Sequence, residues 1–151
     1  MFRAVSGVIL RPSFHRMMRS ALRSNNAQRH CSSITGRWYN LKGSYMDLSD
    51  NNGVLEGCYD TGVGELQTAP IVGFPPKKDG GTFGWVVNWT PEEGDPLTTT
   101  TWTAQCVDVR GKQVLQTTWI LRSEVEKAED RWESTLVGQD TFHRGRHEDS
   151  D

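Results

Sequence analysis

The sequence predicts an all-β domain of about eight short antiparallel strands, arranged as a sandwich or as an up-and-down barrel. Gly, Thr and Trp are frequent, runs that alternate apolar and polar residues recur at regular spacing, and tight turns separate them. At 151 residues the chain supports one domain. A barrel of eight strands has an interior just wide enough for side chains or for one small ligand.

The clearest strand signals are residues 84–89 and 98–106, separated by a loop-forming run of Pro, Glu, Gly and Asp at 91–96. Side chains alternate between the two faces of a strand, so each strand gathers its Trp residues with Val or Thr on one face. These are Trp85, Val87 and Trp89 on the first strand, and Thr98, Thr100 and Trp102 on the second. Facing inward, they would line a pocket that is apolar in bulk and polar at a few points, as small-molecule sites are. The alternative is a sheet core with buried Trp and solvated Thr.

The remaining strands are expected where alternation is bounded by turn residues, at 36–41, 44–48, 54–60, 66–74, 113–122 and 134–142. Asn52-Gly53 predicts a tight hairpin, because this pair accepts positive φ at both central positions. Residues 123–132 are charged and predict a short helix, with Ser123 as its N-cap and Glu126 three residues on, as in a capping box.

The two ends of the chain differ from the part between them. Residues 1–30 contain six Arg and no acid, the composition of a mitochondrial transit peptide, and we interpret them as a leader that is cleaved or disordered. The domain is expected at 31–144, before a polar tail at 145–151. Residues 31–151 carry eleven basic and nineteen acidic side chains, a net charge near −8 that argues against nucleic acid as a partner. No apolar run reaches the ~20 residues that cross a membrane.

No motif predicts catalysis, a metal site or a cofactor. His143 and His147 have the spacing of a metal pair on a helix, but Gly145 lies between them and no Glu follows as a base. No Gly-rich loop precedes a helix, and no nucleophile–base pair is recognisable. Asn88-Trp89-Thr90 matches a glycosylation sequon but lies within a predicted strand.

The three cysteines are Cys31, Cys58 and Cys106, and none form a Cys-x-x-Cys pair, which disfavours a zinc or thioredoxin-type site. One stays unpaired if a disulfide forms. A bridge between two that are far apart in sequence would tie the start of the domain to a middle strand and would indicate an oxidising compartment.

Six blocks of residues, taken together and in order, resemble the avidin family. They are Thr35-Gly36-Arg37-Trp38-Tyr39-Asn40 with Gly43-Ser44; Gly57-Cys58-Tyr59-Asp60-Thr61; Gly84-Trp85-Val86-Val87-Asn88-Trp89; Thr100-Thr101-Trp102 with Gln105-Cys106; Trp119-Ile120-Leu121; and Trp132 with Val137-Gly138-Gln139-Asp140-Thr141-Phe142. The resemblance covers residues 31–144 and implies an eight-stranded antiparallel up-and-down β-barrel. It also implies high-affinity binding of biotin without catalysis, and assembly as a homotetramer.

The resemblance assigns each part of the ligand to residues of this chain. The ureido carbonyl would accept hydrogen bonds from Asn40, Ser44 and Tyr59, and the ring N–H groups would donate to Thr61 and Asp140. The rest of the implied set is Thr100 near the ring sulfur, Thr98 near the valerate carboxylate, the indoles of Trp89, Trp102 and Trp119, Val63, Leu121, and Trp132 lent by a neighbouring subunit.

The resemblance further implies a Cys31–Cys106 disulfide, with Cys58 extra and facing opposite to Tyr59, and it implies secretion, whereas the Arg-rich leader indicates the mitochondrion. Four positions depart from the family, and two of them, Pro96 and Leu97, alter the loop before Thr98. Lys42 stands where the family has an apolar residue, and Glu65 stands where the family's loop approaches the ligand carboxylate.

Two other interpretations stay open. One is a lipocalin-like carrier of a greasy ligand, which would leave five buried polar groups unpaired at ~1–3 kcal/mol each. The other is a degenerate avidin that binds another small ligand or serves as an interaction protein.

Overall fold

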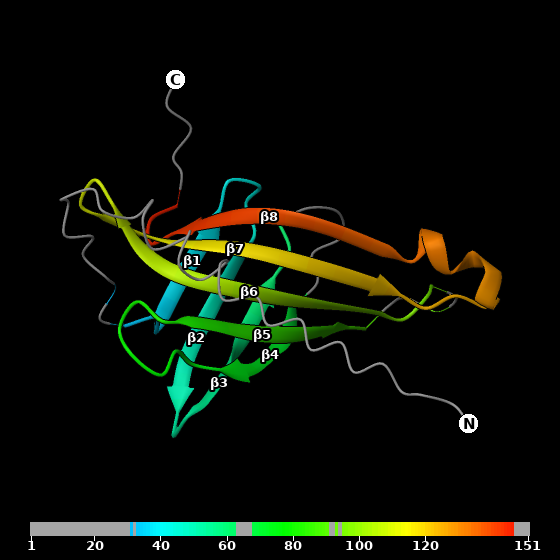
Figure 1. Cartoon of the computed structure of the whole chain (residues 1–151), viewed down its shortest axis with the longest axis horizontal. Helices are drawn as coiled ribbons and strands as arrows, with labels where there is room; N and C mark the ends of the chain where they lie inside the picture. The colour runs from blue at the N-terminus through cyan, green and yellow to red at the C-terminus, as the bar shows by residue number, and fades with distance from the viewer. Residues whose placement is uncertain (1–30, 32, 63–67, 91–92, 94, 147–151) are drawn as a thin grey trace, which may run out of the picture.

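The computed structural model describes residues 31, 33–62, 68–90, 93 and 95–146. The expected leader at 1–30, Val63, Glu65 and the end of the polar tail with His147 lie outside the described residues. The described residues form eight antiparallel strands that pair in chain order and close into a barrel (Figure 1), so the up-and-down barrel is confirmed and the sandwich is not formed. No helix among them is long and apolar enough to cross a membrane.

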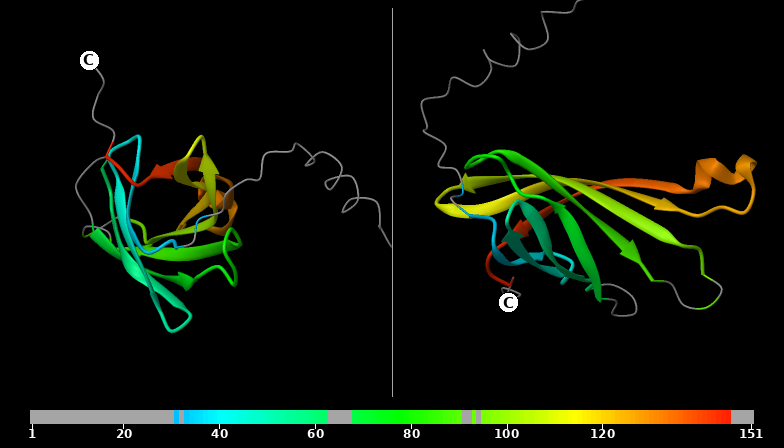
Figure 2. Two further views of the ribbon diagram at one scale, coloured as in Figure 1. Left: turned by 90° about the vertical axis from the view of Figure 1, so that its left-hand side faces the viewer. Right: turned by 90° about the horizontal axis from the view of Figure 1, so that it is seen from below.

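The strands are β1 (Gly36–Asn40), β2 (Tyr45–Asn51), β3 (Val54–Asp60), β4 (Thr68–Phe74), β5 (Thr82–Trp89), β6 (Thr98–Val109), β7 (Lys112–Ser123) and β8 (Thr135–His143). They wrap around a common interior, which Figure 2 shows from one end of the molecule. The pairing is uneven: β6 and β7 pair along their whole length, whereas β1 and β8 meet only at Tyr39↔His143 and Asn40↔Phe142. The connection between β7 and β8 carries a short helix (Figure 1).

Two tight turns at one end of the barrel have positive φ at successive residues. Asn52 and Gly53 have φ values of 54° and 86°, so the predicted Asn-Gly hairpin joins β2 to β3. Arg110 and Gly111 make the corresponding turn between β6 and β7, with φ values of 54° and 81°. Both turns need positive φ at two successive positions, which glycine adopts without strain.

The predicted helix at residues 123–132 is wrong at its beginning. β7 continues through Ser123, which pairs with Thr98 of β6 and donates its N–H to Ser134 O at 2.8 Å. The helix is a 3₁₀ turn, η1 (Ala128–Glu133), whose N-cap Lys127 makes no side-chain capping bond. Sheet pairing commits the backbone of Ser123, so its side chain cannot cap a helix that starts later.

Two features tie down the end of the barrel where the chain enters β1. Cys31 and Cys106 form the disulfide that the resemblance implied, joining the segment before β1 to the middle of β6. The Arg144 guanidinium lies 3.7 Å from the centre of the Trp38 ring and donates to the backbone oxygens of Ser33 and Thr35. These contacts tie the segment before β1 to β6 and to the residue that follows β8.

Cys58 is the free cysteine of the described residues and lies on the outer face of β3. Its thiol lies 3.8 Å from Asp47 Oδ2, while the neighbouring Tyr59 is buried in the interior. The two side chains therefore point to opposite faces, as expected from strand alternation.

Candidate ligand cavity

The up-and-down order brings the β1–β2, β3–β4, β5–β6 and β7–β8 connections to one end of the barrel. A cavity of about 570 Å³ lies there, within the ~300–1,000 Å³ typical of small-molecule sites. Its lining residues are Asn40, Lys42, Ser44, Tyr59, Thr61, Trp89, Asp95, Thr98, Thr100, Trp102, Trp119, Leu121 and Asp140.

The cavity brings together most of the residues that the sequence singled out, although they come from all parts of the chain. Val63 lies outside the described residues, and Trp132 lies on η1 with 76% of its surface exposed, away from this lining. Sequence reasoning noted Lys42 only as a departure and missed Asp95 altogether. A charged residue in a loop carries no signal until the fold shows which end of the barrel that loop occupies.

The β5 and β6 faces that gather Trp, Val and Thr look inward. Thr100 is 3% exposed and its Oγ1 accepts a hydrogen bond of 2.8 Å from Trp89 Nε1. Tyr59 stacks on Trp102 with ring centres 5.2 Å apart and meets Trp89 edge-on at 5.6 Å. The alternative of solvated Thr does not hold for Thr100, because its hydroxyl is buried and bonded to an indole.

Asn40 is held by the tight turn between β1 and β2. Its side-chain Oδ1 accepts from the N–H groups of Lys42 at 3.0 Å and Ser44 at 2.9 Å, and its own N–H donates to Ser44 O at 3.0 Å. Both backbone bonds engage the oxygen of the amide, so the Nδ2 end of this buried side chain is left to donate into the cavity.

Ser44 is oriented by the start of the β3–β4 connection. Gly62 N–H donates to Ser44 Oγ at 3.0 Å, so the backbone fixes the position of this hydroxyl, which also forms a hydrogen bond with Tyr59. A Cβ at Gly62 would lie 2.4 Å from the Ser44 backbone nitrogen, so the two loops approach this closely only because position 62 is glycine.

Tyr59 keeps its phenolic proton. Burial raises the pKa of Tyr59 from 10.0 to about 12, the hydrogen bond with Ser44 lowers it, and the charge of Asp140 raises it. At neutral pH the Tyr59 hydroxyl is therefore a donor, beside the hydroxyl of Ser44.

Asp140 and Trp119 line the cavity from β8 and β7. Thr117 Oγ1 donates to the backbone oxygen of Asp140 at 2.9 Å and holds this part of β8 against β7. Trp119 pairs with Gly138, and a Cβ at Gly138 would lie 2.2 Å from Trp119 Cζ2. The indole thus occupies the space that a side chain at Gly138 would take.

This geometry defines a class of protein: a closed β-barrel with an interior cavity lined by indoles, by hydrogen-bonding side chains and by a carboxylate. The avidin family model matches residues 28–145. The chain belongs to the avidin family.

Relatives and solved structures agree with this assignment. Chicken (Gallus gallus) avidin is 39% identical over 128 residues, which cover 78% of this chain and 81% of the relative, and chicken avidin-related protein 4/5 is 38% identical over 124 residues, covering 77% and 79%. Xenavidin superposes with a TM-score of 0.67 at 34% identity and covers 77% of this chain and 99% of that structure. A structure described as a biotin binding protein from chicken gives 0.63 at 36% identity, with coverage of 76% and 97%.

Proposed function

We propose that this protein binds biotin in the cavity, with high affinity and without catalysis. The observation that carries the proposal is the orientation of three donors, Asn40 Nδ2 and the hydroxyls of Ser44 and Tyr59, by hydrogen bonds and burial within the protein. A urea carbonyl accepts from such a triad, which polarises it toward an oxyanion, and the Asp140 carboxylate accepts from the ring N–H that becomes more positive.

The remaining cavity residues suit the rest of the ligand. In this proposal Thr61 accepts from the second ring N–H, and Thr100 and Thr98 follow along β6 toward the sulfur and the valerate carboxylate. The apolar walls against the bicyclic ring and the tail are Trp89, Trp102, Trp119 and Leu121, with Val63 added from the β3–β4 connection. Aromatic walls bury apolar area while the few polar groups fix the orientation.

High affinity follows from preorganisation. The Asn40 and Ser44 side chains are already fixed by backbone N–H donors, so little side-chain entropy is lost when the ligand enters. The same polar set disfavours a lipocalin-like carrier, since an apolar ligand would leave each buried donor unpaired at ~1–3 kcal/mol.

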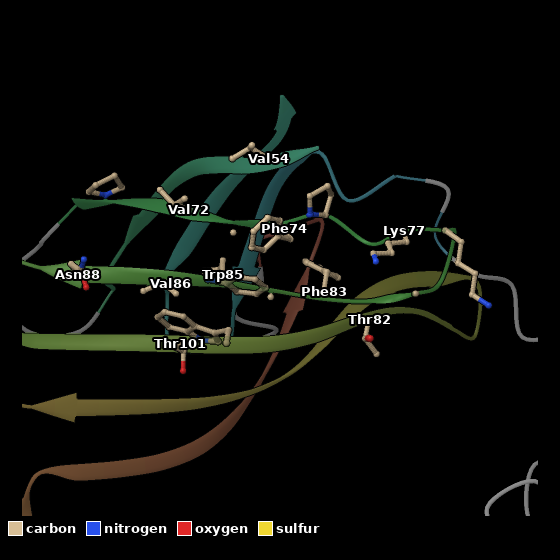
Figure 3. Close-up of a pocket in the computed structure, with 17 residues that line it drawn as sticks. Val54, Val72, Phe74, Lys77, Thr82, Phe83, Trp85, Val86, Asn88 and Thr101 are labelled. Carbon is tan, nitrogen blue, oxygen red and sulfur yellow. The ribbon is translucent and has the colours of Figure 1, made fainter. Parts of the chain in front are cut away.

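We also propose that copies of the chain assemble as a homotetramer. Trp132 is 76% exposed on η1, in the β7–β8 connection at the cavity end of the barrel, where its indole can cover the cavity of a neighbouring subunit. A separate groove of about 1,060 Å³ lies over β4 and β5 and exposes Val72, Phe74 and Val86 (Figure 3). Exposed apolar patches of this kind mark protein–protein contacts.

The disulfide supports a secreted protein, because such bonds persist in oxidising compartments. The mitochondrial alternative rests on the Arg-rich residues 1–30, which lie outside the described residues. Mass spectrometry of the N-terminus of the protein purified from its native source would decide between the two.

The test is a titration of the protein with biotin, followed by calorimetry and tryptophan fluorescence. We expect saturation at one biotin per chain with a change in indole emission, and much weaker binding of diaminobiotin, in which the urea carbonyl has been removed. A fatty acid such as palmitate serves as the second control ligand. Binding of palmitate but not of biotin would favour the lipocalin-like carrier, and binding of neither would favour a degenerate avidin.

A further inference from the structure

The strand register orders the cavity from an inner end to a mouth. Trp102 stacks on buried Tyr59, Thr100 follows at 3% exposure, and Thr98 is the first residue of β6. Since the ring donors Asn40 and Ser44 are buried at the inner end, the tail of a bound ligand points toward Thr98.

Ionised side chains at the mouth are mostly acidic. Asp95 is exposed and lines the cavity three residues before Thr98. Glu124 brings a second carboxylate to the same loop: its Oε2 accepts from Leu97 N–H at 3.2 Å, and its own N–H donates to Leu97 O at 2.8 Å. In the β5–β6 and β7–β8 connections, the described residues 93, 95–97 and 123–134 carry seven carboxylates and two cations.

Lys42 is the cation among the lining residues, but it belongs to the other end of the ligand. Its N–H is bonded to Asn40 Oδ1, so it starts from the turn that holds the ring donors. The backbone of Lys42 thus lies beside the ring donors, whereas Asp95 lies three residues before Thr98, at the tail end of the cavity.

We propose that this acidic mouth selects the tail of the ligand, favouring biotin whose carboxyl group is in amide linkage, and most of all an amide that carries a cation, over the free acid. The inference rests on the proposed function and deepens it. A free acid brings a carboxylate to Asp95, whereas an amide formed with an amine brings none. Two unit charges about 7 Å apart in water-like surroundings change an equilibrium constant about threefold.

Three probes with the same ring system test this: biotin, its neutral methylamide, and its cationic amide with ethylenediamine. Association rates and dissociation constants are measured by tryptophan fluorescence at low and high salt. We expect the cationic amide to bind about tenfold more tightly than the acid at low salt, because the tail charge changes by two units. Added salt should speed association of the acid, slow that of the cationic amide and leave the methylamide unchanged, since a Debye length of about 8 Å at physiological salt screens exposed charges.

Charge-removing variants place the effect at the mouth. Asp95→Asn should reduce the ratio of the dissociation constants of the acid and the cationic amide at least threefold. Asp79→Asn is the matched control, because Asp79 is equally exposed but lies at the opposite end, in the hollow beside the disulfide.

The outcomes separate the two proposals. Binding of all three probes with the same salt dependence, or a ratio of dissociation constants that Asp95→Asn leaves unchanged, overturns the selection by the mouth and leaves biotin binding standing. Binding of none of the three overturns the proposed function and this inference together.

Discussion

Two hollows lie on opposite faces of the same part of the sheet, and they differ in kind. The inner cavity, of about 570 Å³, holds donors whose hydrogen bonds are directed by the backbone. The outer groove over β4 and β5 is larger, about 1,060 Å³, and exposes Val72 and Phe74 at 58% and 75% of their surfaces. Size alone would choose the outer groove as the ligand site. The oriented polar groups of the inner cavity support the proposed biotin site, and the exposed apolar face of the outer groove supports the proposed subunit contact.

If the inner cavity is the ligand site and the outer groove is not, removing the cavity carboxylate should weaken ligand binding. We expect Asp140→Ala to weaken biotin binding by about 3–5 kcal/mol, because a charge-assisted bond loses its acceptor and leaves a ring N–H unpaired. Calorimetry measures the loss, and Asp79→Ala is the control at the far end of the barrel. Unchanged affinity in Asp140→Ala would remove Asp140 from the site.

The outer groove should respond to a buried charge without any effect inside the barrel. Phe74→Asp is expected to weaken assembly by about 2–5 kcal/mol, since an unpaired carboxylate would be buried between subunits. Light scattering reports the shift toward smaller species. Secondary structure by circular dichroism should stay the same, because Phe74 is exposed in the single chain. A variant with the same assembly as wild type would show that this groove is not an interface.

Tyr59, in the inner cavity, should make the stability of the protein depend on pH. Its folded-state pKa is raised to about 12 from 10.0, chiefly by burial, so the protonated form is favoured in the folded protein. A shift from 10.0 to about 12 corresponds to about 3 kcal/mol in the free energy of unfolding. This contribution is fully present below pH 10 and is lost as the pH rises through about 12. Unfolding measured between these pH values should show the loss in wild type, and Tyr59→Phe should remove it. A parallel loss in Tyr59→Phe would assign it to other groups.

A substitution at Gly138 tests whether one wall of the inner cavity, the indole of Trp119, is held in place by the β8 backbone. Gly138→Ala places a methyl group against Trp119, and such overpacking costs about 1–3 kcal/mol. Displacement of the indole into the cavity should weaken biotin binding, and the double variant with Trp119→Phe should recover part of the loss caused by the alanine. Gly145→Ala is the matched control, since no atom lies within 4 Å of its Cβ position. Equal binding by Gly138→Ala and Gly145→Ala would refute the positioning role.

The sequence predicted well wherever local chain chemistry decides the structure. Alternation grouped Trp85 with Val87 and Thr100 with Trp102 on single strand faces, and Asn52-Gly53 formed its hairpin, because strand faces and turns depend on a few adjacent residues. The helix start at Ser123 failed because a capping rule is local, whereas pairing with Thr98 is made across the sheet.

The candidate site needed more than local rules. Asn40 and Asp140 are a hundred residues apart in sequence, and only barrel closure brings them to one cavity. The ordered resemblance to a family supplied that juxtaposition before the fold was known. It did not supply Asp95, which departs from no recognisable motif and gains meaning only from its place at the mouth.

The last prediction concerns Trp132, which joins the two regions if the assembly is as proposed. Its indole is 76% exposed and no residue of η1 is buried, so the single chain gives this side chain no packing partner in the interior. Burial of an indole removes about 150–250 Å² from water, an upper bound of about 4–6 kcal/mol at about 25 cal/mol per Å².

Trp132→Lys should therefore weaken biotin binding by about 1–2 kcal/mol, as loss of a hot-spot residue does, and should shift the tetramer toward a dimer. Calorimetry and light scattering on the same preparation measure both effects. Arg131→Lys, a neighbouring exposed change on η1 that keeps its charge, is the control. A Trp132→Lys protein that stays tetrameric and binds biotin as tightly as wild type would contradict this role. Each cavity would then be closed by its own chain, and Trp132 would not cover the cavity of a neighbouring subunit.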